Sequence, residues 1–144
     1  DNEISWLNWR DREKNKEHYR FCKYMIGFRR KHAILRKALL RSRTGYPDMQ
    51  VMGMDDSSKV LRVVFAGCDE EGQEDMVCLA LNVFWERQEL YLPPLPTGMG
   101  WKIAADTGKE YLKAGIPEDG ALPLAGNSLS MQERSLMVLV ADQL

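Results

Sequence analysis

The sequence predicts a mainly β fold, an antiparallel β-sandwich preceded by one long α-helix. Two observations support this class. Apolar residues recur with helical spacing in residues 15–31, whereas after Pro47 several short apolar runs with strand spacing are separated by turn residues. We therefore divide the chain of 144 residues into a helical segment, residues 1–45, and a sandwich domain of ordinary size, residues 46–144.

The helix is predicted over residues 15–31, with Asn15 as its N-cap, because an Asn side chain can accept hydrogen bonds from the free backbone N–H groups of a first helical turn. Its apolar face repeats at i, i+3, i+4 and i+7 and consists of Phe21, Tyr24, Met25 and Phe28. Cys22 and Ile26 are expected to widen this face. Gly27 lies within the pattern and lowers helix propensity by about 1 kcal/mol relative to Ala; a close backbone approach to a neighbouring element is one explanation for it. Residues 32–43 are expected to add a turn or two.

Six strands follow, in residues 60–66, 76–84, 88–92, 101–105, 127–131 and 136–141. The stretch 76–84 is almost continuously apolar, which is typical of a strand buried on both sides. The last two strands are expected to form a closing hairpin. Alternation places two sets of three residues on a common face of their strands: Leu61, Val63 and Phe65, and Trp101, Ile103 and Ala105.

The net charge of −1 conceals an uneven distribution. Residues 1–45 hold 13 Lys/Arg against 5 Asp/Glu, a net +8, and residues 46–144 hold 7 against 16, a net −9. Such asymmetry indicates either a nucleic-acid-binding arm or two parts of one protein that attract each other. We favour the second interpretation, because the basic residues surround a helix with a good apolar face and show no interleaving with aromatic residues. We expect the helix to pack against the sandwich.

Several function classes are disfavoured. No apolar run approaches the roughly 20 residues that cross a bilayer, and no secretory signal is visible, so we expect neither a membrane nor a secreted context. Cys22, Cys68 and Cys78 form no CxxC pair, which favours a reducing cytoplasm. His18 and His32 are far apart, so no zinc site is expected, and no motif for a cofactor occurs. His18 and Cys22 could pair on the helix, but core packing is favoured over a catalytic role.

Two groups near the beginning of the chain are candidates for sugar contact. Asp1, Asn2 and Glu3 carry carboxylates and an amide that suit sugar hydroxyls, although a surface loop or helix cap explains them as well. Trp6 and Trp9 are spaced i, i+3 and suit either a sugar-stacking pair or, as we favour, a packing anchor. The chain begins without an initiator Met, so we expect it to be a piece of a larger protein.

The sandwich domain offers two further candidates. Trp85, Tyr91 and Trp101 suggest a platform for carbohydrate, but Trp101 alternates in phase with Ile103, which favours the core. The acidic residues of 67–75 are plentiful, yet a glycoside hydrolase needs two carboxyl groups held about 5–10 Å apart on a rigid scaffold. We expect a solvated loop here and no acid/base pair. The sandwich domain is therefore predicted to be a binding or supporting module and not a catalyst.

Several stretches of the chain resemble one known family. Residues 1–9, DNEISWLNW, resemble the segment after the last barrel strand in bacterial glycogen debranching enzymes of the isoamylase type, which belong to the α-amylase superfamily, glycoside hydrolase family 13. Residues 25–36, MIGFRRKHAILR, are similar to the last barrel helix and its exit. The motifs LALNVFWE (79–86) and LYLPPLP (90–96), followed by residues 101–107, are similar to the family's C-terminal β-sandwich.

Two positions depart from the family pattern: Ala33 stands where a Pro usually follows the His, and Phe84 stands where a His usually precedes the Trp. The resemblance implies that residues 1–45 are the end of a (β/α)8 barrel, its last loop and helix. Residues 46–144 would be the sandwich of the α-amylase C-terminal-domain type.

The resemblance also implies a parent enzyme that hydrolyses α-1,6-glucosidic branch points in glycogen or limit dextrins. The family uses an Asp nucleophile, a Glu acid/base and a second Asp, all on earlier barrel strands, so no residue of this chain is assigned a catalytic role. Asp1, Asn2 and Glu3 would border the cleft, no cofactor is implied, and the partners would be the barrel of the same polypeptide and its α-glucan substrate. The rivals are a stand-alone carbohydrate-binding module and a nucleic-acid-binding protein that uses the basic helix.

Overall fold

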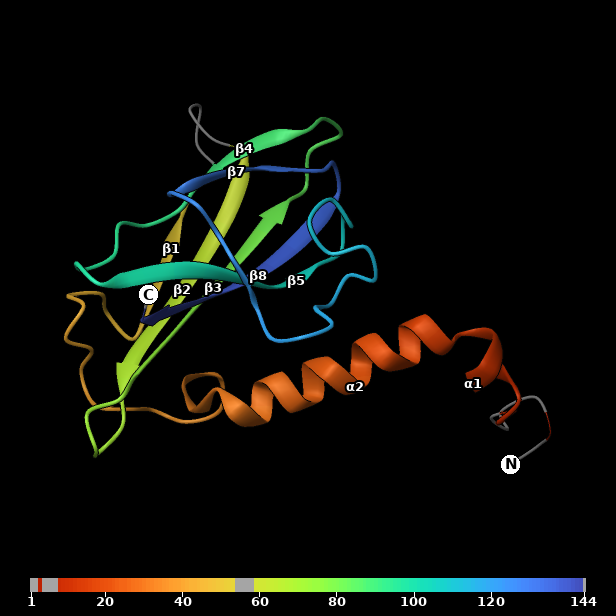
Figure 1. Ribbon diagram of the computed structural model, residues 1–144, viewed down its shortest axis with the longest axis horizontal. Coiled ribbons are helices and arrows are strands. Elements are labelled where there is room, and N and C mark those ends of the chain that lie inside the picture. Colours follow the sequence, from red (N-terminus) through yellow and green to blue (C-terminus); the bar gives the residue numbers. More distant parts are fainter. Residues whose placement is uncertain (1–2, 4–7, 54–58, 144) are drawn as a thin grey trace.

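The computed structural model describes residues 3, 8–53 and 59–143. Its strands are β1 (Met49–Met52), β2 (Val60–Cys68), β3 (Glu74–Asn82), β4 (Gln88–Tyr91), β5 (Met99–Asp106), β6 (Leu122–Pro123), β7 (Ser128–Met131) and β8 (Ser135–Gln143). Its helices are α1 (Asp11–Lys14), α2 (Lys16–Lys31) and the 3-10 turn η2 (Ala33–Leu35). The strands form two antiparallel sheets, β1-β2-β3-β8-β5-β6 and β4-β7 (Figure 1). The mainly β class is thus confirmed, and the sheets are consistent with the predicted sandwich.

One core fills the space between the two sheets. Successive residues of β3 point to opposite faces, so Met76, Cys78 and Ala80 belong to this core and Val77 does not. The small sheet contributes Leu90 from β4 and Met131 from β7. Burial of β3 on both faces explains its nearly continuous apolar sequence.

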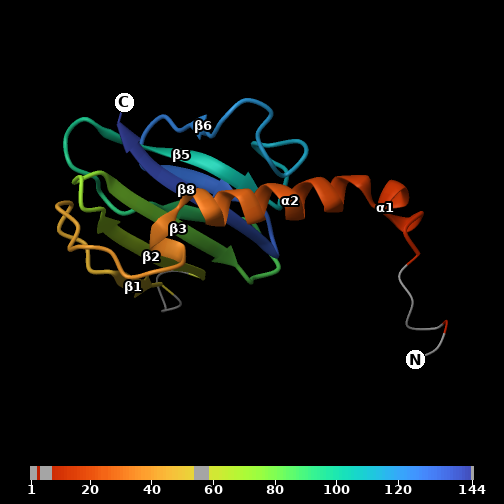
Figure 2. The ribbon, with the colours of Figure 1, turned by 90° about the horizontal axis from the view of Figure 1, so that it is seen from below.

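The other face of the six-stranded sheet is covered by α2. Phe28 of the helix is buried against Val77, Val138 and Val140, and Phe21, Tyr24 and Met25 pack against the same cluster. Figure 2 shows α2 lying along this face, with its N-terminal end extending beyond the sheet. The expected packing of helix on sandwich is therefore confirmed, and the molecule has three layers: small sheet, large sheet and helix.

A β-bulge in β5 changes the expected alternation. Ile103 pairs with Leu139 of β8, but the next pair along the ladder joins Ala105 to Val138, so Ala104 is an extra residue. Trp101 and Ile103 share the core between the sheets as predicted. The placement of Ala105 on that face was wrong, because the bulge turns Ala104 and Ala105 to the helix side.

The bounds of the predicted helix are confirmed within one residue, but three details were wrong. Asn15 makes no side-chain capping bond; its amide donates to the Asp11 carbonyl oxygen at 3.0 Å and joins α1 to α2. Cys22 is exposed and Ile26 is 56% exposed, so neither widens the face that packs on the sheet. A Cβ placed on Gly27 would meet no atom within 4 Å, so no close approach explains this glycine.

The end of the chain also differs from the expected hairpin. β7 pairs with β4 and β8 pairs with β3 and β5, so residues 132–134 connect the two sheets. The two strands were found from their periodicity, but the pairing was wrong because neighbouring strands in sequence belong to different sheets. Of the residues described, no helix has the length and apolar character needed to span a membrane.

Candidate functional site at the helix exit

Of the candidate residues at the beginning of the chain, the structure describes Glu3 and Trp9. Asp1, Asn2 and Trp6 lie outside the described residues. Glu3 is exposed, and Trp9 is 80% exposed. A packing role for Trp9 is therefore not found in this chain, and the cleft position that the resemblance implies for the opening residues stays a prediction.

The three aromatic residues proposed as a platform do not lie together. Trp101 is 1% exposed in the core, where its indole N–H donates to the Pro93 carbonyl oxygen at 2.9 Å. A sugar-stacking role for Trp101 was therefore wrong, and the core alternative is confirmed. Trp85 and Tyr91 are each 65% exposed, but Trp85 lies in the turn before β4 and Tyr91 is the last residue of that strand.

Asp75, at the start of β3, holds the exit of α2. His32, which follows the helix, has its Nδ1 atom 2.7 Å from Asp75 Oδ1, and the Ile34 N–H donates to Asp75 Oδ2 at 3.0 Å. The His32 ring also lies against Phe28, with ring centroids 4.3 Å apart. Burial alone would raise the pKa of the Asp75 carboxyl, but the hydrogen bonds from His32 and Ile34 outweigh it and hold this pKa below its usual value.

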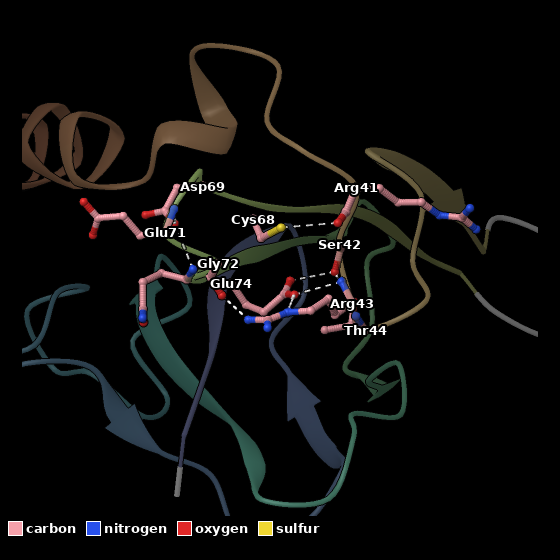
Figure 3. Close-up of polar contacts among 10 residues, drawn as sticks. Arg41, Ser42, Arg43, Thr44, Cys68, Asp69, Glu71, Gly72 and Glu74 are labelled. Carbon is pink, nitrogen blue, oxygen red and sulfur yellow. Dashed lines mark hydrogen bonds and ion pairs between the residues drawn. The ribbon is translucent and has the colours of Figure 1, made fainter.

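Glu74 holds residues 36–48, the connector between η2 and β1, as Figure 3 shows. Its carboxylate accepts hydrogen bonds from the Ser42 hydroxyl at 2.7 Å and from the Arg43 backbone N–H at 2.8 Å. The Arg43 side chain forms an ion pair with the same carboxylate at 3.3 Å and also donates to the Gly72 carbonyl oxygen. A carboxylate that joins a side chain and the backbone of the connector to β3 in this way is a structural anchor.

A third acidic residue of the β2–β3 hairpin, Asp69, shapes the turn itself. Asp69 accepts hydrogen bonds from the backbone N–H groups of Glu71 at 3.0 Å and Gln73 at 2.8 Å. The prediction of a wholly solvated loop was therefore wrong for Glu74 and Asp75, which lie at the start of the strand and are largely covered. The hydrogen bonds of Asp69, Glu74 and Asp75 all join parts of the same chain.

Backbone contact between the connector and β2 depends on Gly67. Leu40 and Cys68 exchange two backbone hydrogen bonds of 2.9 Å. A Cβ on Gly67 would lie 2.8 Å from the Leu39 Cβ and 3.2 Å from the Leu40 carbonyl oxygen. Because a Cβ has no freedom to move away, only glycine permits this approach.

Arg36 ends the helix by a contact that the sequence did not reveal. Its guanidinium donates to the carbonyl oxygens of Arg29 and Arg30, both at 3.0 Å. These are among the C-terminal carbonyls that an α-helix leaves without an internal partner. The helix exit is therefore fixed at three points, by Arg36, by Asp75 and by Glu74.

Two ion pairs at the helix exit reflect the uneven distribution of charge along the chain. His32 with Asp75 and Arg43 with Glu74 join the basic segment to the acidic domain. A third pair has the opposite polarity, since Lys109 of the domain lies 3.2 Å from Glu17 of the helix. A groove of about 1100 Å³ beside α2 is lined by charged residues of both signs, so it indicates no preference for a cation or an anion.

The three thiols differ in exposure and partners. His18 and Cys22 do meet, with Nε2 and Sγ 3.5 Å apart, but on the exposed side of α2, so the core role we favoured for them was wrong. Burial raises the pKa of the Cys78 thiol to about 12, which keeps it protonated and unreactive. Among the residues that the structure covers, no three or more His, Cys, Asp or Glu side chains are grouped as metal ligands.

Neither a protein-family model nor a curated protein matches this chain.

Proposed function

We propose that this chain is the C-terminal part of a glycogen debranching enzyme of the isoamylase type, and that its role is to support the catalytic barrel. In this proposal α2 is the last helix of the barrel, and residues 46–144 are the sandwich that holds it in place. The intact protein would hydrolyse α-1,6-glucosidic branch points. The resemblance of residues 1–9 and 25–36 supplies the family, and the two-sided character of α2 is the structural observation in its favour.

The helix has apolar residues on two sides. One side packs on the large sheet through Phe28 and its neighbours. Roughly on the opposite side, Tyr19, Cys22 and Ile26 recur at i, i+3 and i+7, with Tyr19 46% and Ile26 56% exposed. A helix that covers a single core needs only one apolar stripe. A second stripe is expected of a helix that lies between two bodies, the sandwich and a barrel.

The fixed exit of the helix also favours a supporting role. Residues 32–44 are held to the β2–β3 hairpin, so the C-terminal end of α2 has a set position on the sheet. The described residues from Asn8 to Arg20 are all exposed in this chain. Their exposure is expected if the surface that covers them belongs to the preceding part of the polypeptide.

The test is made on the intact protein that the gene encodes. Release of linear chains from a glycogen limit dextrin is measured for that protein and for residues 1–144 alone. We expect debranching by the intact protein and none by the isolated chain. Ile26→Gln should lower the thermal stability and the activity of the intact protein, whereas Lys113→Gln, at an exposed position of the loop between β5 and β6, should not. An intact protein that leaves α-1,6 linkages untouched would overturn the proposal.

A further inference from the structure

We propose that Phe84 and Trp85, in the turn between β3 and β4, form a platform that binds an α-glucan chain. The choice of glucan as ligand rests on the proposed function; the existence of the platform rests on geometry. The site lies on the sandwich, and its role would be to hold the polymer while the barrel acts on it.

The two rings provide a flat surface. Their centroids are 3.9 Å apart and their planes differ by 27°, so Phe84 covers one face of the indole. Trp85 is nevertheless 65% exposed, so the area open to solvent is the other face and the ring edge. The C–H face of a glucose ring stacks on such a surface, because both are apolar and flat.

The platform is held rigid by a buried amide. Asn82 is 1% exposed, and its side-chain N–H groups donate to the Glu86 carbonyl oxygen at 2.9 Å and the Gln132 carbonyl oxygen at 2.8 Å. Its Oδ1 atom accepts from the Phe84 N–H at 3.1 Å, and the Phe84 carbonyl oxygen accepts from the Arg134 N–H at 3.1 Å. A turn fixed in this way before binding loses little conformational entropy when a ligand arrives.

Polar side chains of the same corner suit a neutral polyhydroxylated ligand. Arg87 lies two residues after Trp85, and its guanidinium is 3.4 Å from the Glu110 carboxylate, to which the Gln132 amide also donates. Figure 1 shows that the β3–β4 turn lies at the same end of the sandwich as the loop after β5 and the turn between β7 and β8. The group offers donors and acceptors for hydroxyls, while Arg87 and Glu110 cancel in charge.

Tyr91 provides a matched control. It is as exposed as Trp85, at 65%, and belongs to the same strand region, but it lies at the far end of β4 from the turn. A general loss of exposed aromatic area would weaken binding equally at both positions. If the Phe84–Trp85 turn is a specific platform, glucan binding should weaken when Trp85 is replaced and stay unchanged when Tyr91 is replaced.

The test measures binding of residues 1–144 to glycogen by affinity electrophoresis and to maltoheptaose by calorimetry. We expect the wild-type chain to be retarded by glycogen, Trp85→Ala to bind about five- to tenfold more weakly, and Tyr91→Ala to bind as the wild type does. Trp85→Phe, which keeps a flat ring, should fall between them. Urea denaturation should show that all three variants are folded.

Two outcomes overturn the inference: a wild-type chain that binds neither ligand, and a Trp85→Ala chain whose affinity equals that of wild type or of Tyr91→Ala. If Trp85→Ala instead lowers the thermal stability of the intact protein and leaves its glucan affinity unchanged, the Phe84–Trp85 pair is a contact with the barrel and not a glucan platform. Debranching of a small soluble dextrin by the intact wild-type protein separates the two proposals, because this activity tests the proposed function without the glycogen-binding measurement. A failure of debranching counts against the proposed function, and a failure of glycogen binding counts against the platform.

Discussion

The two ends of strand β3 differ in how their side chains are used. At its start, Glu74 and Asp75 are committed to holding the helix exit and the connector. At its end, Asn82 fixes a turn whose most prominent side chain, Trp85, is left mostly in solvent. The acidic end has the residue types of a catalytic site but is an anchor. The aromatic end presents an ordered, exposed surface.

This difference shows that residue type alone is a poor guide to function in this chain. The carboxylates at the first end accept hydrogen bonds from the helix exit and the connector, which gives them a structural role. The rings at the second end are positioned by their backbone, and their surface is available. This difference can be tested by substituting residues at or beside each end of β3 and measuring the free energy of unfolding.

The largest effect is expected from Phe28→Ala in α2, the helix whose exit the acidic end of β3 holds. Phe28 is 6% exposed between α2 and the sheet and lies against the His32 ring, so its removal should lower the free energy of unfolding by about 3–5 kcal/mol. Trp85→Ala at the other end should change it by less than about 0.5 kcal/mol. Urea denaturation followed by circular dichroism provides both values. Similar losses of unfolding free energy in the two variants would contradict the proposed difference between the two ends of β3.

A smaller loss is expected from Gly67→Ala, about 1–3 kcal/mol, because the new Cβ would press the connector away from β2. Gly27→Ala is the matched control. Its Cβ meets nothing within 4 Å and Ala favours a helix, so this variant should be more stable by about 0.5–1 kcal/mol. Thermal unfolding of both variants checks the opposite signs, and a stable Gly67→Ala would contradict the close approach.

Asp75→Ala should cost about 1–3 kcal/mol, because it leaves the Ile34 N–H and the His32 ring without their partner. Glu71→Ala, an exposed position of the same hairpin, should cost little. Hydrogen exchange at the Ile34 amide should rise in the first variant and stay unchanged in the second. An unchanged exchange rate in Asp75→Ala would show that the helix exit is held by other contacts.

The smallest effect is the pH dependence of the same contact. The pKa of Asp75 is lower in the folded chain, so its contribution is complete above the unfolded pKa of about 4 and is lost as pH falls through the lower folded value. The stability difference between wild type and Asp75→Asn should therefore shrink below about pH 4. Urea midpoints between about pH 6 and pH 2 would show this, and a constant difference would contradict it.

Periodicity predicted the fold well where the physical signal is local. The helix and the buried strands β2, β3, β5 and β8 follow from spacing of apolar residues, and the phase of Trp101 with Ile103 indicated its burial correctly. The bulge at Ala104 was not predictable, because neither alanine has a preference for one face. The sheet to which β7 belongs was missed because pairing depends on distant strands.

The contacts of the helix exit were not predictable for the same reason. Asp75 and His32 are 43 residues apart, and Glu74 and Ser42 are 32 apart, so no local pattern joins them. The sequence showed the acidic turn of the β2–β3 hairpin and the basic segment, residues 1–45, only as opposite net charges. It did not show which residues pair. The stacking of Phe84 on Trp85 could have been noticed from two adjacent aromatic residues before a turn, but the buried amide of Asn82 that fixes them requires the fold.

The claim that α2 lies between two bodies is tested most directly by the reactivity of Cys22. In residues 1–144 this thiol is exposed, while Cys68 and Cys78 are buried, so a maleimide should label Cys22 alone under native conditions. In the intact protein, we predict that the barrel covers the side of α2 that carries Tyr19, Cys22 and Ile26, and that labelling of Cys22 slows by at least about tenfold. Equal labelling rates in the chain and in the intact protein would contradict the supporting role proposed for the sandwich.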